Sequence, residues 1–561
     1  MSTSTDPQPA FWQTLERQGL AQLASWSDRA VLLTLVMLFS IWVAVDVLFL
    51  GVTGGIAQST YDAMVRYRVM APAHDPRIVI VDIDESALAR MAPEFGRWPW
   101  PRDTLATVLD HIESQGPAAV VWDVVFSDAD KLSPGGDAAF DEAAHRSTHS
   151  HFSVVRLPTK NDDKSELTHQ HLSNLWIQAP TASTAATVAL VPPVLPSIAK
   201  RPLGYNNGYV DADGILRRYR YFERLSDGSI IQSLPMSVVQ ALNPELHSQW
   251  LSRFTAKAAS TEHSEASDVL INWRKTAETY QRVNFADVFA QADGGEVRST
   301  VPSMAGKIVI IGATAPSLHD THPTPLSGTQ AGVESLATGI DNALHQRWIW
   351  ELPKWAGALI AILMCAGIAL WSYRRSVSST AGPTVGVPAL LLGIGYLSLH
   401  TESVFIDLHL SAGLALLFLA VLKFWYFLRK KHWCGDLPAY TPAPAVWTWE
   451  SNQPWSDDQL DRLMMALQQS APQCRLLLLD LSPSDRLWVS WRPFSTCLAL
   501  VGPADVLRTA QARLLGSVRD AHVRCSEIEN LESATPAQDV RRRMTQRALQ
   551  GWSSLQQSVP H

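Results

Sequence analysis

The segment Arg77–Asp130 reads RIVIVDIDESALARMAPEFGRWPWPRDTLATVLDHIESQGPAAVVWDVVFSDAD, and it decides the fold class. Two short apolar runs within it, Ile78–Val81 and Ala118–Phe126, are dominated by β-branched residues and predict strands. Between them, Asp103–Gln115 has apolar residues at helical spacing, and Gly116-Pro117 predicts the end of that helix. The order strand, helix, strand predicts a parallel pair of strands joined by a right-handed crossover.

Acidic residues follow both predicted strands. Asp82, Asp84 and Glu85 follow the first strand, and Asp123 and Asp128 follow the second. Open α/β sheets bind their ligands outside the carboxyl ends of the strands. We therefore expect an acidic, concave site at this edge of the sheet, which either binds or cleaves a ligand.

The length and composition indicate a membrane protein with several domains. The chain has 561 residues, and its net charge of -7 is modest and spread out, which argues against a nucleic-acid partner. Four apolar segments predict transmembrane helices, at residues 30–50, 355–371, 385–399 and 410–428. The first could instead be a cleaved signal peptide, but its long apolar core and the few basic residues before it favour an uncleaved anchor.

Basic residues predict how the chain crosses the bilayer. Arg374-Arg375 follow the second span and Arg429–Lys431 follow the fourth, so both clusters are expected on the cytoplasmic side. The prediction is a cytoplasmic tail, an extracytoplasmic α/β domain and a small α/β cytoplasmic domain of unknown function, at residues 1–29, 51–351 and 436–561. All five cysteines lie in or after the second span, so the outer domain needs no disulfide.

Several blocks of sequence resemble the type-2 CHASE domain, a sensory module of bacterial receptors. The blocks are IVIVDIDESAL, GRWPWPRD (96–103), WDVVFSDAD (122–130), GYNNGYVDADGILRR (204–218), INWR (271–274), NFADVF (284–289), GKIVIIGATAPSLHDTHPTPL (306–326) and GVESLATGIDNAL (332–344). They cover roughly residues 45–350 in the family's order. One departure is Leu336-Ala337, where the family usually has His-Ala, so no role of that histidine is carried over.

The resemblance implies a multi-pass protein of the bacterial inner membrane. A signal-receiving domain on the outer side is commonly followed by three spans, which agrees with the four apolar segments. Both chain ends are then cytoplasmic. The expected partners are an unknown small ligand or an envelope protein outside and a protein partner in the cytoplasm. The oligomeric state is left open, with a homodimer as one alternative.

The candidate ligand-binding residues lie at the predicted carboxyl edge and in the blocks near it. They are Asp82, Asp84, Arg97, Trp98, Asp123, Asp320 and Glu334. Each has a structural alternative. Asp82 and Asp84 could cap the following helix, and Trp98 could pack on the sheet beside a loop stiffened by prolines. Asp320 and Glu334 could form ion pairs with Arg217 or Arg218.

Asp82 and Asp84 also allow a second hypothesis, a metal-dependent hydrolase. A strand followed by Asp-x-Asp is how some phosphatases present an aspartate nucleophile and a partner that holds Mg²⁺. That chemistry needs a lysine and a further acidic pair, and the sequence offers no convincing Gly-Asp-x-x-x-Asp. Binding or capping is therefore favoured, and we expect no catalytic residue and no cofactor.

A histidine-rich stretch could suggest a metal site. Its residues are His145, His149, His151, His169 and His171. Without cysteine or closely spaced carboxylates the metal signal is poor. We predict no metal site here and interpret residues 145–171 as a polar surface excursion.

Other segments complete the predicted elements. Strands are expected at Thr187–Val191, Tyr219–Phe222, Val269–Trp273 and Lys307–Gly312, and a helix at Gly332–Leu344. Near the C-terminus, a capping box at Ser456–Gln459 opens a helix, strands are expected at 475–481, 487–491 and 496–501, and helices are expected at 504–515 and from 535.

The C-terminal region has no recognisable catalytic motif, since neither a phosphate-binding loop nor a kinase catalytic loop is present in its sequence. The favoured function is a receptor-like membrane protein whose outer domain relays a signal to a noncatalytic cytoplasmic domain. The alternatives are a membrane-anchored hydrolase using Asp82 and a structural component of an envelope complex.

Overall fold

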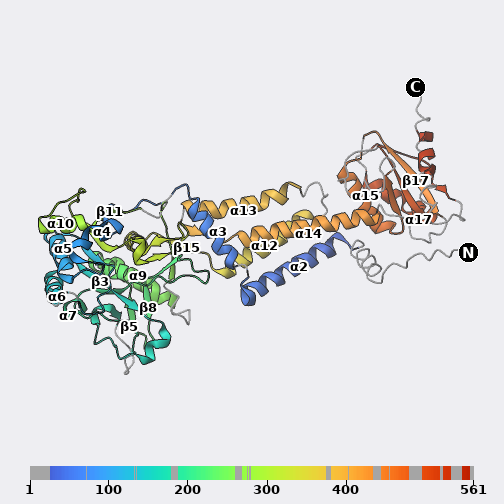
Figure 1. Cartoon of the computed structure of the whole chain (residues 1–561). Helices are drawn as coiled ribbons and strands as arrows, with labels where there is room; N and C mark the ends of the chain where they lie inside the picture. The colour runs from blue at the N-terminus through green and yellow to red at the C-terminus, as the bar shows by residue number, and fades with distance from the viewer. Residues whose placement is uncertain are drawn as a thin grey trace, which may run out of the picture. The chain divides into compact units, whose positions relative to one another are not determined.

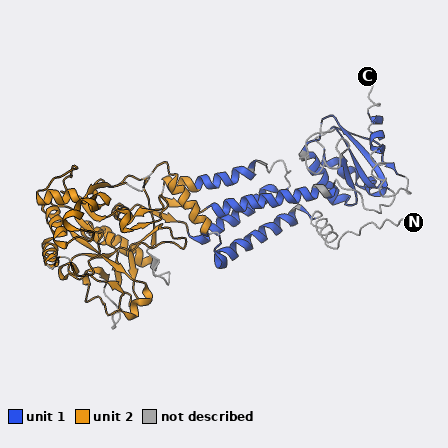
Figure 2. Cartoon of the chain, viewed as in Figure 1, with its two compact units in different colours: residues 1–54, 353–394, 408–561 blue, residues 55–352, 395–407 orange. Residues whose placement is uncertain are grey.

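A sheet of parallel strands forms the core of the α/β part of the computed structural model (Figure 1). The structure describes residues 26–52, 54–70, 72–131, 133, 135–178, 187–258, 268–274, 276, 279–373, 381–401, 403–433, 444–453, 455–478, 496–518, 522–531, 546–551 and 553–555. The chain divides into two compact units (Figure 2). The α/β unit comprises residues 55–352 and 395–407, and the helical unit comprises residues 1–54, 353–394 and 408–561.

The central sheet lies in the α/β unit. Its parallel strands run in the order β11 (Gln281–Asn284), β1 (Ile78–Ile83), β12 (Ile308–Ala313), β2 (Ala119–Trp122), β3 (Ser150–Arg156) and β6 (Leu203–Tyr205). The short strand β5 (Leu190–Val191) pairs antiparallel with β3. Strands buried on both faces read as continuous apolar runs, which explains the sequence of β1 and β12.

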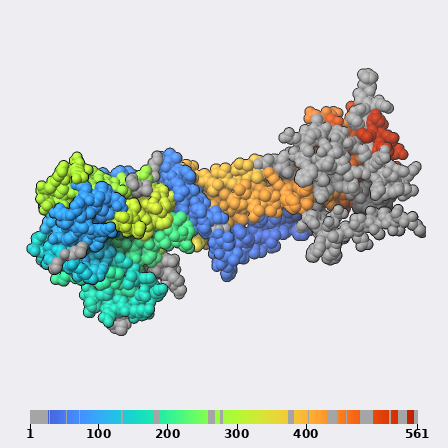
Figure 3. All heavy atoms as spheres, in the orientation of Figure 1, coloured from blue at the N-terminus to red at the C-terminus, as the bar shows by residue number. Residues whose placement is uncertain are grey.

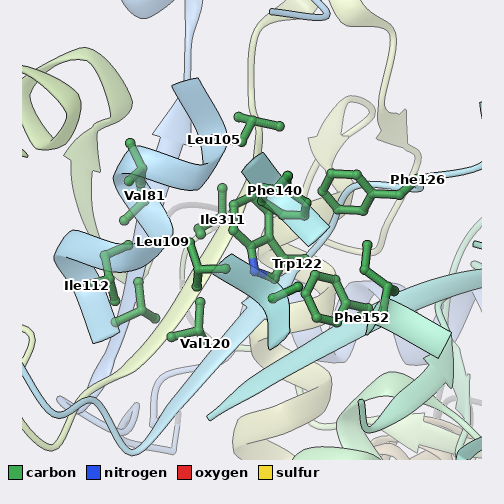
Figure 4. Close-up of a cluster of buried hydrophobic side chains, with 14 of the residues drawn as sticks. Val81, Leu105, Leu109, Ile112, Val120, Trp122, Phe126, Phe140, Phe152 and Ile311 are labelled. Carbon is green, nitrogen blue, oxygen red and sulfur yellow. The ribbon is translucent and has the colours of Figure 1, made fainter. Parts of the chain in front are cut away.

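Helices cover both faces of this sheet. On one face, α5 (Arg102–Ser114), α6 (Gly136–Arg146) and α10 (Phe285–Asp293) contribute to the core, and on the other α8 (Leu234–Leu242) and α11 (Gly332–Leu344) do so. Figure 4 shows the first core, where Trp122 lies among Phe126, Phe140 and Phe152. The ring centroids of Trp122 and Phe140 are 5.2 Å apart. The predicted helices 103–115 and 332–344 are therefore confirmed.

One feature of the predicted topology is wrong. Strands β1 and β2 are parallel, as expected, but they are not neighbours, because β12 lies between them and pairs with both. Residues 308–313 are almost wholly buried there. A further helix, α4 (Glu85–Phe95), also lies in the connection ahead of α5.

The interpretation of residues 145–171 as a surface excursion is also wrong. They contain β3, whose residues are nearly all buried. Two of its polar side chains have partners inside the fold, since His151 Nδ1 lies 3.0 Å from Ser237 Oγ and Ser153 Oγ donates to the Val124 carbonyl at 3.0 Å. Ser150 Oγ is buried without a hydrogen-bond partner among the described residues. Because buried polar side chains can be accommodated when they have hydrogen-bond partners, β3 contains polar residues that are also typical of loops.

Smaller sheets complete the α/β unit. A four-stranded sheet has the order β16 (Val404–Phe405), β15 (Trp348–Glu351), β10 (Asp268–Ile271) and β7 (Arg218–Arg220). A three-stranded sheet contains β4 (Trp176–Gln178), β9 (Ile230–Gln232) and β8 (Phe222–Arg224), and β13 (Thr321–His322) pairs with β14 (Gln330–Ala331). The remaining helices are α3 (Gly54–Arg66), α7 (Pro196–Ala199) and α9 (Pro244–Ala258), with 3-10 turns at Thr159–Lys164, Ser173–Leu175 and Pro316–Leu318. The predicted strand 219–222 is thus two short strands.

The predicted spans lie in the helical unit, except for the last residues of the third span, which belong to the α/β unit. Helix α2 (Asp28–Val45) continues as a π-helical turn over Asp46–Leu50, and α12 (Lys354–Ser372), α13 (Ala381–Thr401) and α14 (His409–Trp433) follow later in the chain. Four helical segments, at 29–50, 354–372, 384–401 and 409–429, are long and apolar enough to cross a membrane. Large apolar side chains such as Phe49 and Leu370 are exposed on them, and Figure 3 shows this surface with α2 in blue and α14 in orange.

A small mixed domain, here called the C-terminal domain, follows α14. Its antiparallel sheet contains β18 (Arg475–Leu478), β19 (Cys497–Pro503), β17 (Pro444–Ser451), β20 (Val523–Cys525) and β21 (Glu529–Asn530). Helices α15 (Asp457–Ser470) and α17 (Ala504–Ser517) share one core with it. The predicted capping box at Ser456 and Gln459 is confirmed. The predicted strand 487–491 and the start of the helix at 535 lie outside the described residues.

Candidate functional site

A cavity of about 490 Å³ lies at the carboxyl edge of the central sheet. Ile83 at the end of β1, Ala313 at the end of β12, Asp123 just after β2 and Val155 near the end of β3 all line it. The edge that the sequence predicted as a ligand site is therefore hollow. Its volume lies within the range of small-molecule sites, about 300–1,000 Å³.

Asp123 forms the acidic centre of this cavity. Its Oδ1 accepts a hydrogen bond from Asn206 Nδ2 at 2.6 Å, and Asn206 Oδ1 in turn accepts from the Tyr219 hydroxyl at 2.8 Å. This chain fixes the orientation of the carboxylate. Its other oxygen, Oδ2, is buried and has no hydrogen-bond partner among the described residues.

Asp320 is the second carboxylate that lines the cavity. It precedes β13, and its backbone carbonyl accepts from the Gly332 amide at 3.0 Å. A Cβ on Gly332 would lie 2.7 Å from both carboxylate oxygens of Asp320, and a Cβ on Gly312 would lie 3.0 Å from the Cβ of Asp123. Glycine at position 332 therefore leaves room for the carboxylate of Asp320, and glycine at position 312 leaves room for Val333 and Asp123.

The two carboxylates influence each other's ionisation. Burial raises the pKa of Asp123 to about 7, and the negative charge of Asp320 adds to this effect. Burial also raises the pKa of Asp320, whereas His322 acts in the opposite direction. Because two close carboxylates in a desolvated site do not readily ionise together, the pair holds a proton near neutral pH.

We expect Gly332→Ala to disturb this pair. The added methyl group has to displace the carboxylate of Asp320, at a cost of about 1–2 kcal/mol in the free energy of unfolding, measured by thermal unfolding of the full-length protein. Gly328→Ala is the matched control, because a Cβ there meets nothing within 4 Å. Equal stability of the two variants would show that Asp320 is not held against Gly332.

Asp82 and Glu334 lie outside this cavity, in a different cluster. The Thr314 hydroxyl donates to Asp82 Oδ1 at 2.6 Å, and Arg282 NH1 lies 3.8 Å from Asp82 Oδ2. Burial raises the pKa of Asp82, although Thr314 and Arg282 oppose this. Arg282 also donates to Glu334 Oε1 from Nε at 3.0 Å and NH2 at 2.8 Å.

The alternative in which Glu334 pairs with Arg217 or Arg218 is wrong. Arg217 pairs with Asp62, Asp211 and Asp213, and Arg218 pairs with Asp211 and Glu351. Glu334 instead pairs with Arg282, which belongs to β11 at the edge of the central sheet. Charge alone could not choose among the arginines of the sequence, because the choice depends on which strand lies beside α11.

Of the other candidate residues, one lines the cavity and the others do not. Asp84 caps α4, because its carboxylate accepts from the Ala87 amide at 2.6 Å, which confirms the capping alternative. Trp98 lines the cavity, whereas Arg97 is exposed and is not among the residues that line it. Trp100 is buried against Phe285, with ring centroids 5.0 Å apart.

The candidate histidines are separated in the structure. His149 Nδ1 lies 2.8 Å from Glu113 Oε2, and His151 is buried beside Ser237. In the part of the chain that is described, no group of three or more His, Cys, Asp or Glu residues could hold a metal ion.

Sequence reasoning missed four residues that line the cavity or support it: Asn206, Tyr219, His322 and Ser335. Asn206 and His322 fall inside the GYNNGY and HDTHP blocks, whose shared polar residues were a usable signal. Tyr219 and Ser335 belong to elements that were predicted as a strand and a helix, and no pattern marked them as different from packing residues.

The sequence was compared with models of known protein families. A family model, the CHASE2 domain, matches residues 32–371, which is more than half of the chain. The chain belongs to the CHASE2 family. CHASE2 domains are extracellular sensory domains, so the family supports a sensory role and the cavity lies within its sensory part. No curated protein and no solved structure matches the chain.

Proposed function

We propose that this protein is a sensor of the bacterial inner membrane, whose CHASE2 domain lies outside the cytoplasm and binds a small ligand in the Asp123 cavity. The observation that carries the proposal is this cavity, which lies in a unit whose elements are joined directly to the ends of all four candidate spans. A relay needs such joints, because a ligand shifts a conformational equilibrium only through contacts that differ between two states.

The first joint is α3, which follows the first span. Its Tyr61 hydroxyl donates to the Ile271 carbonyl at 2.9 Å. Its Asp62 accepts two hydrogen bonds from the buried guanidinium of Arg217, at 2.8 and 2.7 Å. A bidentate arginine–carboxylate pair fixes orientation as well as distance. Movement of the α/β unit is therefore expected to reach the first span through α3.

The second joint is Arg68, which is buried just after α3. Its NH1 donates to Asn272 Oδ1 at 2.6 Å and to the Trp273 carbonyl at 3.3 Å, and its NH2 donates to the Leu399 carbonyl at 3.2 Å. Leu399 lies near the end of α13, so one side chain connects the start of the α/β unit to the third span.

The third joint is the pair of strands β15 and β16. Strand β15 ends at Glu351, three residues before α12 begins at Lys354, and β16 lies in the turn between α13 and α14. The strands pair in parallel register, Trp350 with Val404 and Glu351 with Phe405. The second, third and fourth spans are thus held by one small sheet.

After the fourth span, α14 continues to Trp433, and the C-terminal domain follows it in the chain. Trp433, at its end, is buried in the core of that domain, and Arg429 NH2 lies 3.6 Å from Asp461 Oδ1 of α15. We propose that this domain is the cytoplasmic output, and that it acts by binding a partner protein. The basic residues after the second and fourth spans support the orientation.

We further propose that the protein is not an enzyme. The hydrolase alternative needs Asp82 as a nucleophile, but its carboxylate is buried, bonded to Thr314 and close to Arg282. A nucleophile has to face a substrate, and Asp82 is not among the residues that line the cavity.

Hydrogen exchange of the full-length protein in lipid nanodiscs tests the sensory proposal. A library of small organic cations, anions and neutral solutes is added at millimolar concentration. We expect at least one compound to protect the peptides with Asp123 and Asp320 and also to change exchange at residues 403–405. A library without any effect, or protection of the cavity alone, would contradict the proposal.

Arg68→Gln should separate binding from relay. Loss of the guanidinium removes three hydrogen bonds of a buried side chain, so we expect exchange at residues 403–405 to rise about tenfold while cavity peptides exchange as before, a change of about 1.4 kcal/mol in local opening. Arg66→Gln is the matched control, because Arg66 is exposed and bonds one carbonyl, that of Pro325. If both variants behave alike, Arg68 is not a joint.

A further inference from the structure

The charges of the cavity are unbalanced. Asp123 and Asp320 are its two acidic residues, and His322 is its one basic residue among the described residues that line it. Neither a lysine nor an arginine is found in that described lining. When both carboxylates are ionised, the cavity therefore attracts positive charge.

Two hydrogen-bonding groups of the lining residues have no partner among the described residues and could each accept a hydrogen bond from a ligand. Asp123 and Ser335 both line the cavity, and the buried atoms Asp123 Oδ2 and Ser335 Oγ have no hydrogen-bond partner in the described part of the chain. Ser335 is only 4% exposed. An ionised carboxylate can only accept hydrogen bonds, and a serine hydroxyl can accept them. A ligand that brings several N–H donors would satisfy both groups.

The rest of the lining is apolar. Trp98, Leu216, Leu318 and Leu336 contribute carbon surface, and the cavity of about 490 Å³ is far larger than a single ion requires. The described residues also lack a cluster of three His, Cys, Asp or Glu side chains that could hold a metal. A ligand with a charged end and a hydrocarbon body fits these features better than a bare cation.

We propose that the cavity binds an organic cation with a protonated primary amine, which donates hydrogen bonds to Asp123 and Ser335 while its carbon chain lies against the apolar wall. An ammonium group has three donors and no acceptor, which matches the acceptors that lack partners. This inference rests on the proposed sensory function, and it specifies the class of ligand.

The proposal predicts how binding depends on pH. The charged and titratable groups around Asp123 are Asp320, His322 and, through Asn206, Tyr219, whose pKa burial raises well above its usual value. Since the pKa of Asp123 lies near 7, an ammonium group displaces a proton when it binds. A primary amine, with a pKa near that of lysine (about 10.4), stays charged. Affinity should therefore rise between pH 6 and pH 8, by roughly fivefold to tenfold.

The experiment is isothermal titration calorimetry of the full-length chain in nanodiscs with four probes: 1-aminobutane, butan-1-ol, butanoate and calcium chloride. We expect only the amine to bind, and Asp123→Asn to weaken its binding at least tenfold. Ser335→Ala should weaken it about threefold. Asp128→Asn is the matched control, because Asp128 is exposed and does not line the cavity, and its affinity should equal that of the wild type.

Some outcomes would overturn the inference. They are equal binding of the alcohol, binding of calcium in place of the amine, no binding of the amine, or amine affinity that Asp123→Asn leaves unchanged. The sensory proposal is tested separately by hydrogen exchange. If the amine does not bind but another solute protects the cavity and changes exchange at residues 403–405, only the ligand class is wrong.

Discussion

Arg217→Ala is expected to destabilise the α/β unit more than other single changes of charge. Arg217 is 1% exposed, and it pairs with Asp62, Asp211 and Asp213 at 2.7–2.9 Å. Removing one partner of a buried ion pair leaves uncompensated charge, at a cost of about 3–5 kcal/mol. Thermal unfolding of the full-length protein in detergent should show a midpoint lower by roughly 5–10 °C.

The matched control is Arg146→Ala. Arg146 also pairs with two carboxylates, Asp110 and Glu142, at 2.7 Å, but half of its side chain is exposed. Exposed ion pairs contribute roughly 0–1 kcal/mol, so this midpoint should hardly move. If Arg217→Ala were as mild as the control, α3 would not be held to the rest of the unit by this arginine.

Asp123→Asn is expected to make the protein more stable at alkaline pH. The pKa of Asp123 is raised from its usual value near 3.8 to about 7 in the folded state. A group whose folded pKa is raised contributes stability that is fully present below its unfolded pKa and is lost as the pH rises through the folded pKa. The wild type should therefore lose stability between pH 4 and pH 7, on the order of 1–3 kcal/mol.

The asparagine variant has no such proton to lose. Thermal midpoints of both proteins, measured from pH 4.5 to 8.5, should be similar at the acidic end and should differ at pH 8, where the variant melts higher. Asp128→Asn, on an exposed position, should follow the wild type throughout. A variant that melts below the wild type at pH 8 would mean that ionised Asp123 is well stabilised by the fold.

Local sequence patterns predicted most of the helices and strands, but they did not predict the order of the strands in the sheet. The runs at β1, β2 and β12 were apolar enough to be recognised, because burial on both faces demands it. Which of them are neighbours depends on pairing between residues about 190 to 230 positions apart, and no periodicity records this. Strand β3 was missed for a different reason, since His151 and Ser153 are buried with partners that lie elsewhere in the chain.

The candidate site was predicted in part for a similar reason. The rule that ligands bind at the carboxyl edge identified Asp123, and the sequence blocks near this edge supplied Asp320 and Trp98. All three residues line the cavity. It could not separate them from Asp82, because successive strand residues point to opposite faces. Ile83 lines the cavity and Asp82 is bonded to Thr314 beside Arg282. One position along a strand therefore separates a lining residue from a structural one.

The end of α14 has a geometric consequence for the C-terminal domain. Arg429 and Trp433 are four residues apart and thus lie on one face of the helix, and both are buried against this domain. Each residue of a helix advances the chain by about 100° around the axis. The angular setting of the C-terminal domain is therefore fixed by the number of residues in α14, and any turn of this helix about its own axis becomes an equal swing of the whole domain.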